Sequence, residues 1–377
     1  MTMRNHKPFR VGLVGAGHIC EHHVCALRRL KRIHLVGVTD LDNVRAKAFG
    51  EKHGVRIFPS LPVMAEEGLD CVHVLTPPAA HVPVALEALG LGCHVLIEKP
   101  MGEDVAACER VAVEAQRRGL KVCVNHSLLF DPLIRRTLGM VKKGRIGRVV
   151  SVDVIRSSVY PPYAGGPLPP YMRQAGYPFR DLGVHALYLM EAFLGPIESA
   201  EGRWESLGCD PNLMFDEWSV VVRCRDGMGR IQLSWNVKPV QNLLIIQGTR
   251  GVLRVDPLLM FVTRKTSTRL PKPAERLWNV VTDSVPPLFQ APLNVVRFLT
   301  GQLKPYQGVH NLVAAFYRAL RMGKPMPVGV EEAIRAVRWT EQVARQADVA
   351  GRKVRPRRES LPRAEVLITG ASGRLGS

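Results

Sequence analysis

The sequence of 377 residues lacks long apolar segments, and no stretch approaches the about 18 consecutive apolar residues that a membrane span requires. The residues before the first predicted strand, up to Pro8, contain no apolar region of the kind that opens a secretory signal. The eight cysteines include no C-x-x-C pair, and most of them lie within apolar runs. We therefore expect a cytoplasmic protein with free thiols, no bound metal ion and no membrane span.

Signals for nucleic-acid binding are also missing. Basic residues outnumber acidic ones by 52 to 33, but aromatic residues make up only 6% and no recognition motif accompanies the charge. Much of the basic surplus is local, with five basic residues in 263–276 and six in 352–363. A solvated basic surface is the favoured interpretation, and an electrostatic approach route for an anionic substrate is the alternative.

The order of predicted elements indicates two domains. Hydrophobic residues make up 46% of the chain, enough to build cores, and the length exceeds that of one average domain. In the first third, strand-like runs (11–14, 34–38, 71–75, 94–97, 121–124) alternate with helix-like runs that include 82–89 and 104–117. This alternation predicts an α/β fold that opens with a doubly wound parallel sheet of the Rossmann type over residues 1–128.

Beyond residue 128 the pattern changes. The runs 149–156, 218–224, 229–235 and 243–248 are β-like, and no helix separates most of them. We expect an α+β domain over residues 129–352, with a large, mostly antiparallel open sheet. Residues 160–171, rich in Pro, Gly and Tyr, predict a loop. Residues 258–306 are consistent with an amphipathic helix at an interface or with a loop-rich insertion.

A glycine-rich turn follows the first predicted strand. Gly15 permits a tight turn, and Gly17 lets the backbone approach a pyrophosphate. The predicted helix begins directly afterwards, with His18 and Ile19, so its N-terminus would face that pyrophosphate. Asp40 ends the second strand, where a carboxylate binds both ribose hydroxyls and repels a 2′-phosphate. The pattern Gly15-Ala16-Gly17 with Asp40 therefore predicts a dinucleotide site that prefers NAD to NADP.

Four further segments resemble the Gfo/Idh/MocA oxidoreductases, in the order that family has them. They are Asp70–His81, His94–Pro100 with its Glu-Lys-Pro triplet, the D-x-x-x-H of Asp181 to His185, and Gln247–Asp256 with a G-T-x-G turn. The similarity covers roughly residues 8 to 352. It implies an NAD-dependent oxidoreductase that acts on carbohydrate hydroxyls.

The resemblance also implies roles for individual residues. Lys99 would bind the substrate hydroxyl and stabilise alkoxide charge, and His185 would take the hydroxyl proton. If 181–195 is one helix, residues four apart share a face, and Asp181 can orient His185. The implied cofactor contacts are Gly15, Ala16, Gly17, His18, Ile19, Asp40, Arg45, Thr76, Pro77, His81, Glu98, Lys99 and Asn125. Weaker candidates for substrate contacts are His126, Arg156, Tyr163 and Arg180.

Two departures from the family pattern affect the substrate pocket. Leu129 stands where many relatives have Arg, and Tyr177–Arg180 replaces a glycine-rich approach to Asp181. The substrate is therefore left open among sugars, cyclitols and nucleotide-linked sugars. Alternatives are a dehydrogenase or reductase of a non-sugar ketone or imine, or an NAD-binding regulatory protein without turnover. Family analogy implies a homodimer or homotetramer.

A second signal lies at the end of the chain. Residues 364–377 combine a strand-like run with Gly370-x-x-Gly373-x-x-Gly376, which resembles the opening of an NAD-dependent epimerase or short-chain dehydrogenase. We expect the truncated start of a second Rossmann domain, to which the basic residues 353–363 form the linker. The native chain would then be fused to an epimerase-like domain.

Overall fold

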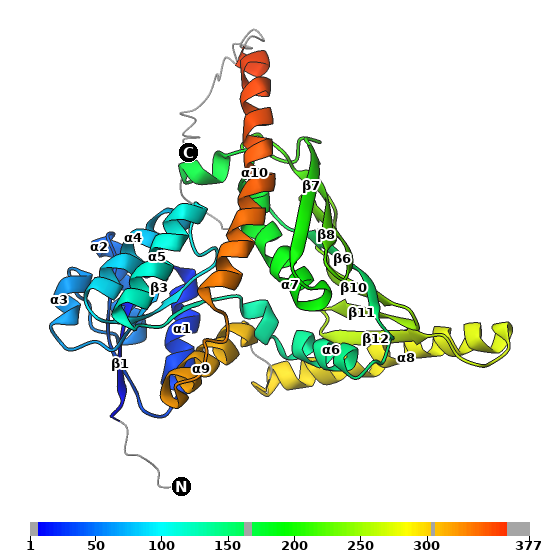
Figure 1. Ribbon diagram of the computed structural model, residues 1–377, viewed down its shortest axis with the longest axis horizontal. Coiled ribbons are helices and arrows are strands. Elements are labelled where there is room, and N and C mark those ends of the chain that lie inside the picture. The colour runs from blue at the N-terminus through cyan, green and yellow to red at the C-terminus, as the bar shows by residue number, and fades with distance from the viewer. Residues whose placement is uncertain (1–6, 162–167, 303–305, 360–377) are drawn as a thin grey trace, which may run out of the picture.

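The computed structural model describes residues 7–161, 168–302 and 306–359. Two sheets carry the fold, one on each side of a long C-terminal helix (Figure 1). The first sheet has five parallel strands in the order β2-β1-β3-β4-β5. Its strands are β1 (Phe9–Val14), β2 (Ile33–Thr39), β3 (Cys71–Val74), β4 (His94–Ile97) and β5 (Val122–Val124). The helices between them are α1 (His18–Arg28), α2 (Asn43–His53), α3 (Leu61–Ala65), α4 (Pro78–Gly90) and α5 (Val105–Arg118).

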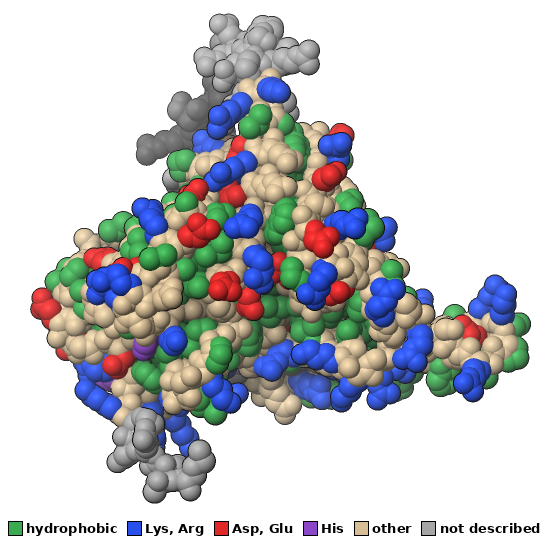
Figure 2. Space-filling model, in the orientation of Figure 1, with side chains coloured by type: hydrophobic (Ala, Val, Ile, Leu, Met, Phe, Trp, Pro, Cys, Tyr) green, Lys and Arg blue, Asp and Glu red, His purple; other side chains and the backbone are tan. Residues whose placement is uncertain are grey.

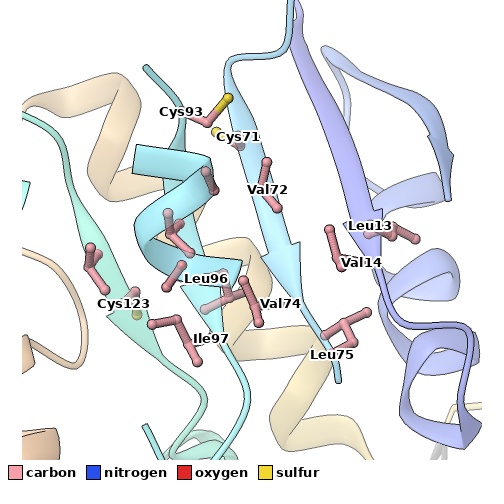
Figure 3. Packing of buried hydrophobic residues seen from close by; sticks show 14 of the residues in the cluster. Leu13, Val14, Cys71, Val72, Val74, Leu75, Cys93, Leu96, Ile97 and Cys123 are labelled. Atoms are coloured by element: carbon pink, nitrogen blue, oxygen red, sulfur yellow. The ribbon is translucent and has the colours of Figure 1, made fainter. Parts of the chain in front are cut away.

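The centre of this sheet is apolar on both faces. Side chains of successive strand residues, such as Cys71 and Val72 on β3 and Leu96 and Ile97 on β4, are fully buried and pack across the strands (Figure 3). Continuous burial of this kind follows from helices that cover both faces of a parallel sheet. Cys71 and Cys123 belong to the same buried cluster, where their thiols act as small apolar groups. The predicted doubly wound sheet is confirmed.

The second sheet has seven strands in the order β12-β11-β10-β6-β9-β8-β7, and only β6 and β9 pair in parallel. Its strands are β6 (Val149–Ser157), β7 (Ile197–Glu205), β8 (Glu217–Cys224), β9 (Gly227–Ser234), β10 (Asn242–Gly248), β11 (Gly251–Asp256) and β12 (Phe261–Thr266). Buried and exposed residues alternate along β8, as expected of a sheet with one face covered and one exposed. The expected mostly antiparallel sheet is confirmed.

Helices and short turns complete this half of the molecule. They are the 3-10 turns η1 (Ser127–Phe130) and η2 (Pro170–Arg173), the π-helical turn η3 (Phe179–Gly183), and the helices α6 (Pro132–Lys142), α7 (Val184–Leu194) and α8 (Lys272–Leu299). Residues 258–306, which sequence patterns left undecided, therefore contain a strand and a long helix. Three prolines inside α8 had obscured its helical pattern.

The last two helices, α9 (Gln307–Met322) and α10 (Val330–Glu359), return to the first sheet. Leu312 and Phe316 of α9 are fully buried in the same cluster as the Rossmann strands. A division of the chain near residue 128 therefore does not separate the two cores in space. The helix α10 also continues through residues 353–359, so this part of the expected linker is helical. The remaining linker residues and the epimerase-like segment 364–377 lie outside the described residues.

Among the described residues, none of the helices combines the length and the apolar character that crossing a membrane requires. The same part of the chain contains no group of three or more His, Cys, Asp or Glu side chains placed to hold a metal ion.

Candidate functional site

A cavity of about 850 Å³ lies at the carboxyl ends of the first sheet's strands. Ligands of open α/β sheets bind at this edge. The cavity lining includes most of the predicted cofactor residues, namely Gly15, Gly17, His18, Ile19, Asp40, Arg45, Thr76, Pro77, His81, Glu98 and Lys99. Asp181 and Arg180 also line it, whereas Ala16, Asn125, His126, Arg156 and His185 are not among its lining residues.

The glycine-rich turn has the geometry that a dinucleotide needs. Gly15 has a φ of +101°, and a Cβ added there would come within 2.7 Å of the Leu75 backbone. Gly17 precedes α1, and a Cβ added at this position would meet no atom within 4 Å, so its backbone borders open space. Cys20 stands where the G-x-G-x-x-G fingerprint of dinucleotide sites has its third glycine, and it is fully buried, so a small side chain fits there. The turn can therefore hold a pyrophosphate at the helix N-terminus.

Asp40 is fixed on one side by this turn and on the other by Arg45. Its carboxylate accepts backbone hydrogen bonds from Ala16 (2.7 Å) and Asp42 (2.9 Å) and a two-point contact from the Arg45 guanidinium (2.9 and 3.0 Å). Burial raises the pKa of Asp40, but the hydrogen bonds from Arg45, Ala16 and Asp42 outweigh it and lower that pKa below its usual value. Asp40 is thus ionised at neutral pH, and Arg45 acts on the cofactor site through it.

Thr76 and His81, which also line the cavity, differ in whether their polar side-chain atoms are free to bind a ligand. The Thr76 hydroxyl is buried and has no hydrogen-bond partner among the described residues. An orphaned hydroxyl in a cavity wall is an available contact for a bound polar molecule. The His81 ring nitrogens, in contrast, lie 2.6 Å from the Pro100 carbonyl and 2.7 Å from the Thr76 carbonyl. His81 therefore ties two loops together, and its ring has no nitrogen left for the cofactor.

Taken together, the turn, Asp40 and Thr76 fit a nicotinamide dinucleotide. Gly15 to Ile19 would hold the pyrophosphate, and Asp40 would hold the adenosine ribose. The nicotinamide supplies a hydride acceptor or donor when it is bound.

Lys99 joins the two halves of the molecule at the cavity. It follows β4, and its ammonium donates to the Asp181 carboxylate (2.9 Å) and the Asp181 carbonyl (3.2 Å). Burial raises the pKa of Asp181, but the neighbouring Lys99 and Arg156 charges prevail and lower it. The pair places a fixed ammonium in the wall of the cavity.

The expected contact between Asp181 and His185 is absent. Asp181 belongs to the π-helical turn η3 and His185 to α7, so the continuous α-helix that the prediction assumed does not exist. The Lys99 ammonium is also a stronger partner for a carboxylate than an imidazole is. His185 is oriented by Tyr188 instead, whose hydroxyl lies 2.6 Å from Nδ1.

His185 nevertheless shares the electrostatic environment of this centre. Burial, followed by the charges of Lys99, Arg156 and His126, lowers the pKa of His185 well below its usual value. The imidazole is therefore neutral at neutral pH. Its Nε2 makes no hydrogen bond within the described chain, and this nitrogen accepts a proton when Nδ1 carries the ring hydrogen.

Glu98 connects the cavity to a buried network that the sequence patterns did not reveal. His23 Nε2 lies 3.0 Å from Glu98 Oε1, and Asn125 donates to the same oxygen. His23 Nδ1 lies 2.8 Å from His73 Nδ1, and His73 Nε2 lies 2.8 Å from the Tyr317 hydroxyl. The one available signal was His73 itself, a polar residue in the middle of an apolar strand.

The predicted substrate contacts have different surroundings, and they remain predictions. Arg180 lines the cavity, but its guanidinium is already bound by Glu341 (2.8 and 2.9 Å) and Asp348 (2.8 Å), so it ties η3 to α10. His126 stacks on Tyr188 with ring centroids 4.3 Å apart, and burial lowers the pKa of His126 to about 3. Arg156 contributes charge near Asp181 and His185. Tyr163 lies outside the described residues.

The basic surplus of the chain is not gathered in this cavity. Its lining contains the basic side chains Arg45, Lys99 and Arg180 against the acidic Asp40, Glu87, Glu98, Glu103, Asp181 and Glu341. The idea that the net charge attracts an anionic substrate to the site therefore loses its support. The positive charge must lie elsewhere on the surface.

Comparison with known proteins identifies the relatives of this chain. A dTDP-3,4-didehydro-2,6-dideoxy-α-D-glucose 3-reductase of Actinomadura kijaniata is 32% identical over 195 residues, which are 51% of this chain and 58% of the relative. A trans-1,2-dihydrobenzene-1,2-diol dehydrogenase of Sus scrofa is 27% identical over 257 residues, 66% of this chain and 74% of the relative. The chain spans about half the length of the first curated relatives.

A solved structure shows the same fold. It is the UDP-N-acetylglucosamine 3-dehydrogenase of Acidithiobacillus ferrooxidans, with a TM-score of 0.70 and 19% identity, covering 91% of this chain and 99% of that one. Family models match on both sides of the molecule: "Oxidoreductase family, NAD-binding Rossmann fold" over residues 9–126 and "GFO/IDH/MocA C-terminal domain" over residues 134–254. The chain therefore belongs to the Gfo/Idh/MocA oxidoreductase family, with an N-terminal NAD-binding Rossmann domain.

Proposed function

We propose that the protein is an NAD(H)-dependent oxidoreductase that interconverts a carbohydrate hydroxyl and the corresponding ketone. The observation that carries this proposal is the Lys99 ammonium, which Asp181 holds at the cavity in the electrostatic field that also includes His185. Alcohol oxidation needs a positive group to stabilise alkoxide and a base to remove its proton.

Each residue has a task that its surroundings permit. The Lys99 ammonium would donate to the substrate oxygen and stabilise its negative charge, because Asp181 keeps it in place. His185 would take the hydroxyl proton at Nε2, because its imidazole is neutral and Tyr188 fixes the ring. In the reductive direction the same nitrogen would return the proton.

Turnover with a panel of substrates tests the proposal. The purified chain would be incubated with NAD and sugars, cyclitols or sugar nucleotides, and NADH absorbance would report oxidation. We expect at least one member to be oxidised, with loss of the rate in Lys99→Ala. Binding of NADH without turnover of any carbohydrate, in either direction, would refute the proposal.

Within carbohydrates, we propose a nucleotide-linked sugar or a sugar acid derived from one. The support is the chemistry of the relatives, since one acts on a dTDP-linked sugar and the structural neighbour on a UDP-linked one. Thermal shift of the NAD-loaded protein tests this, and the nucleotide sugar should raise Tm more than inositol or free glucose. A preference for either neutral ligand would contradict it.

A second candidate function is oxidation of a non-sugar diol or reduction of a ketone or imine. The relative that favours it is the trans-1,2-dihydrobenzene-1,2-diol dehydrogenase. Both candidates use the same Lys99 and His185 chemistry, so a substrate panel that includes cyclic diols separates them. A regulatory protein without turnover would bind NADH but oxidise neither class.

We propose that the enzyme is cytoplasmic, a homodimer or homotetramer, and fused to an epimerase-like domain that begins near residue 364. All eight cysteines are free in the structure, which suits a reducing compartment. The exposed face of the seven-stranded sheet is the surface on which such an assembly would form. Light scattering of the purified chain tests the assembly, and sequencing of the coding region beyond Ser377 tests the fusion.

A further inference from the structure

Helix α8 lies along the edge strand β12 with its polar side inward. The Asn279 side chain accepts from the Thr266 backbone N–H (3.0 Å) and donates to the Thr266 carbonyl (3.2 Å). Asp283 accepts from the Thr263 hydroxyl (2.7 Å), and Asn294 donates to the Met260 carbonyl (2.8 Å). These contacts satisfy backbone groups of an otherwise open sheet edge. Asn279, Asp283 and Asn294 therefore face β12 and bind the protein itself.

The opposite side of α8 is apolar and exposed. None of its side chains is buried, although a surface helix normally buries its apolar side. The exposed large apolar residues of the helix are Leu277, Trp278, Val280, Val281, Val285, Leu288, Phe289, Leu293, Val295, Val296, Phe298 and Leu299. Leu288 and Phe289, near the middle, are 69% and 73% exposed. Since a helix rises 1.5 Å per residue, this surface, which we call the α8 apolar face, extends over about 33 Å.

Positive charge lies beside the α8 apolar face. The segment from Pro132 to Val152, which begins with α6, holds six Lys and Arg residues and no acidic residue. Helix α6 packs on β11 and on β12, the strand along which α8 lies. Lys and Arg side chains gather along the edge of the molecule from which α8 projects, with apolar side chains among them (Figure 2).

The acidic residues of α8 are outnumbered by its basic ones. The helix holds three basic residues (Lys272, Arg276 and Arg297) against Glu275 and Asp283, and Asp283 is paired with Lys265 of β12. A second copy of the chain docked on the α8 apolar face would bring two such basic borders together. An anionic surface would complement them.

We propose that the α8 apolar face docks on an anionic phospholipid bilayer and lies in the plane of its interface. A helix with Trp, Phe and Leu on its free side, bordered by Lys and Arg, has the features of an interfacial membrane helix. Anionic lipids of a cytoplasmic leaflet attract such basic borders. The proposal makes the enzyme peripheral to the membrane and leaves its cavity on the first sheet free.

Vesicle flotation with the full chain tests the proposal. The protein should float with vesicles of phosphatidylcholine and phosphatidylglycerol but not with phosphatidylcholine alone. The double variant Leu288→Asp/Phe289→Asp should bind anionic vesicles with an affinity at least about tenfold lower, because each charge must enter the apolar region of the bilayer. Val113→Asp, at a 64% exposed apolar position on α5, is the matched control and should bind like the parent. Unchanged Tm and NADH affinity would show that both variants fold.

Tryptophan fluorescence supplies a second measurement. Trp278 is half-exposed, so anionic vesicles should shift its emission to the blue, and Trp278→Phe should remove the shift. Equal binding to neutral and anionic vesicles, or no binding to either, would overturn the proposal. So would a dimer in light scattering that the double variant dissociates while vesicles bind neither form, because a second copy would then occupy the face.

Discussion

The cofactor preference depends on the ion pair between Asp40 and Arg45. The Asp40 carboxylate already accepts four hydrogen bonds, two of them from Arg45, whose side chain is 51% exposed. The 2′-phosphate of NADP(H) would therefore meet the Asp40 carboxylate, which repels it, and the Arg45 guanidinium, which attracts it, already bound to each other. Substituting Asp40 with Ser removes the repulsive carboxylate and leaves the Arg45 guanidinium free to bind the phosphate.

The difference in binding free energy between NAD(H) and NADP(H) depends on how far the attraction of Arg45 cancels the repulsion of Asp40. Two unit charges about 4 Å apart near a protein surface interact by about 4 kcal/mol, and both solvent and salt reduce that figure at an exposed group. Because Arg45 offsets much of the repulsion, we expect NAD(H) to bind about tenfold more tightly than NADP(H), a gap of roughly 1.4 kcal/mol. Arg45→Ala should widen the gap, since Asp40 loses its counter-charge. Asp40→Ser should narrow it or reverse it, since Arg45 is then free to bind the phosphate.

Isothermal calorimetry with both cofactors measures these three ratios directly. Glu51→Gln is the matched control, because it removes an exposed carboxylate of the same helix α2 that contacts neither Asp40 nor Arg45. Its ratio should equal that of the parent. The reasoning is refuted if Arg45→Ala and Asp40→Ser shift the preference in the same direction, or if the parent binds both cofactors equally.

The remaining predictions concern the chemistry and the helix α10. Lys99→Ala and His185→Ala should each lower kcat by about a hundredfold or more, and His185→Ala should leave NADH affinity unchanged. Normal turnover in either variant would exclude the assigned role. Since burial and neighbouring charges lower the pKa of His185, the imidazole stays neutral as pH falls, and kcat/KM should hold its plateau below about pH 6.5. A profile that falls at or above that pH would contradict this. Arg180→Ala should lower the free energy of unfolding by about 3 kcal/mol, because it leaves the buried Glu341 without its main partner. Arg345→Ala, a more exposed partner of Glu341, should cost less than about 1 kcal/mol in the same urea titration.

The cofactor half of the site could be predicted because its signals are local. Gly15 and Gly17 act through their own backbone, and Asp40 occupies a fixed place at the end of the second strand. The strands themselves were readable because each is a short apolar run between helices. His23 and Tyr317 could not be found in this way, because their contact with Glu98 or His73 depends on segments far apart in the chain.

The residues proposed to carry the chemistry show where periodicity fails. The spacing of Asp181 and His185 suggests a helical pair, yet Asp181 lies in a π-helical turn and its carboxylate binds Lys99. Arg180 similarly looked like a substrate ligand, although its partners on α10 lie more than 150 positions away in the sequence. In both cases the side chain binds a charged group from another element, and local sequence patterns carry no information about such a partner. For residues 258–306 the choice between an amphipathic helix and a loop-rich insertion stayed open for a different reason, because the prolines of α8 break the pattern and its apolar side faces outward.

The position of α10 explains how these distant contacts are held in register. Its first turns contribute Val337 to the Rossmann core, and its later turns contribute Val343 to the core of the second sheet. Glu341 lies between them, binds Arg180 and lines the cavity. Lys99 follows a strand of the first sheet, whereas Asp181 precedes α7, which packs on the second sheet, so their 2.9 Å contact depends on the relative placement of the two sheets. Helix α10 therefore supports the contact between Lys99 and Asp181 through Arg180, the neighbour of Asp181 in the chain.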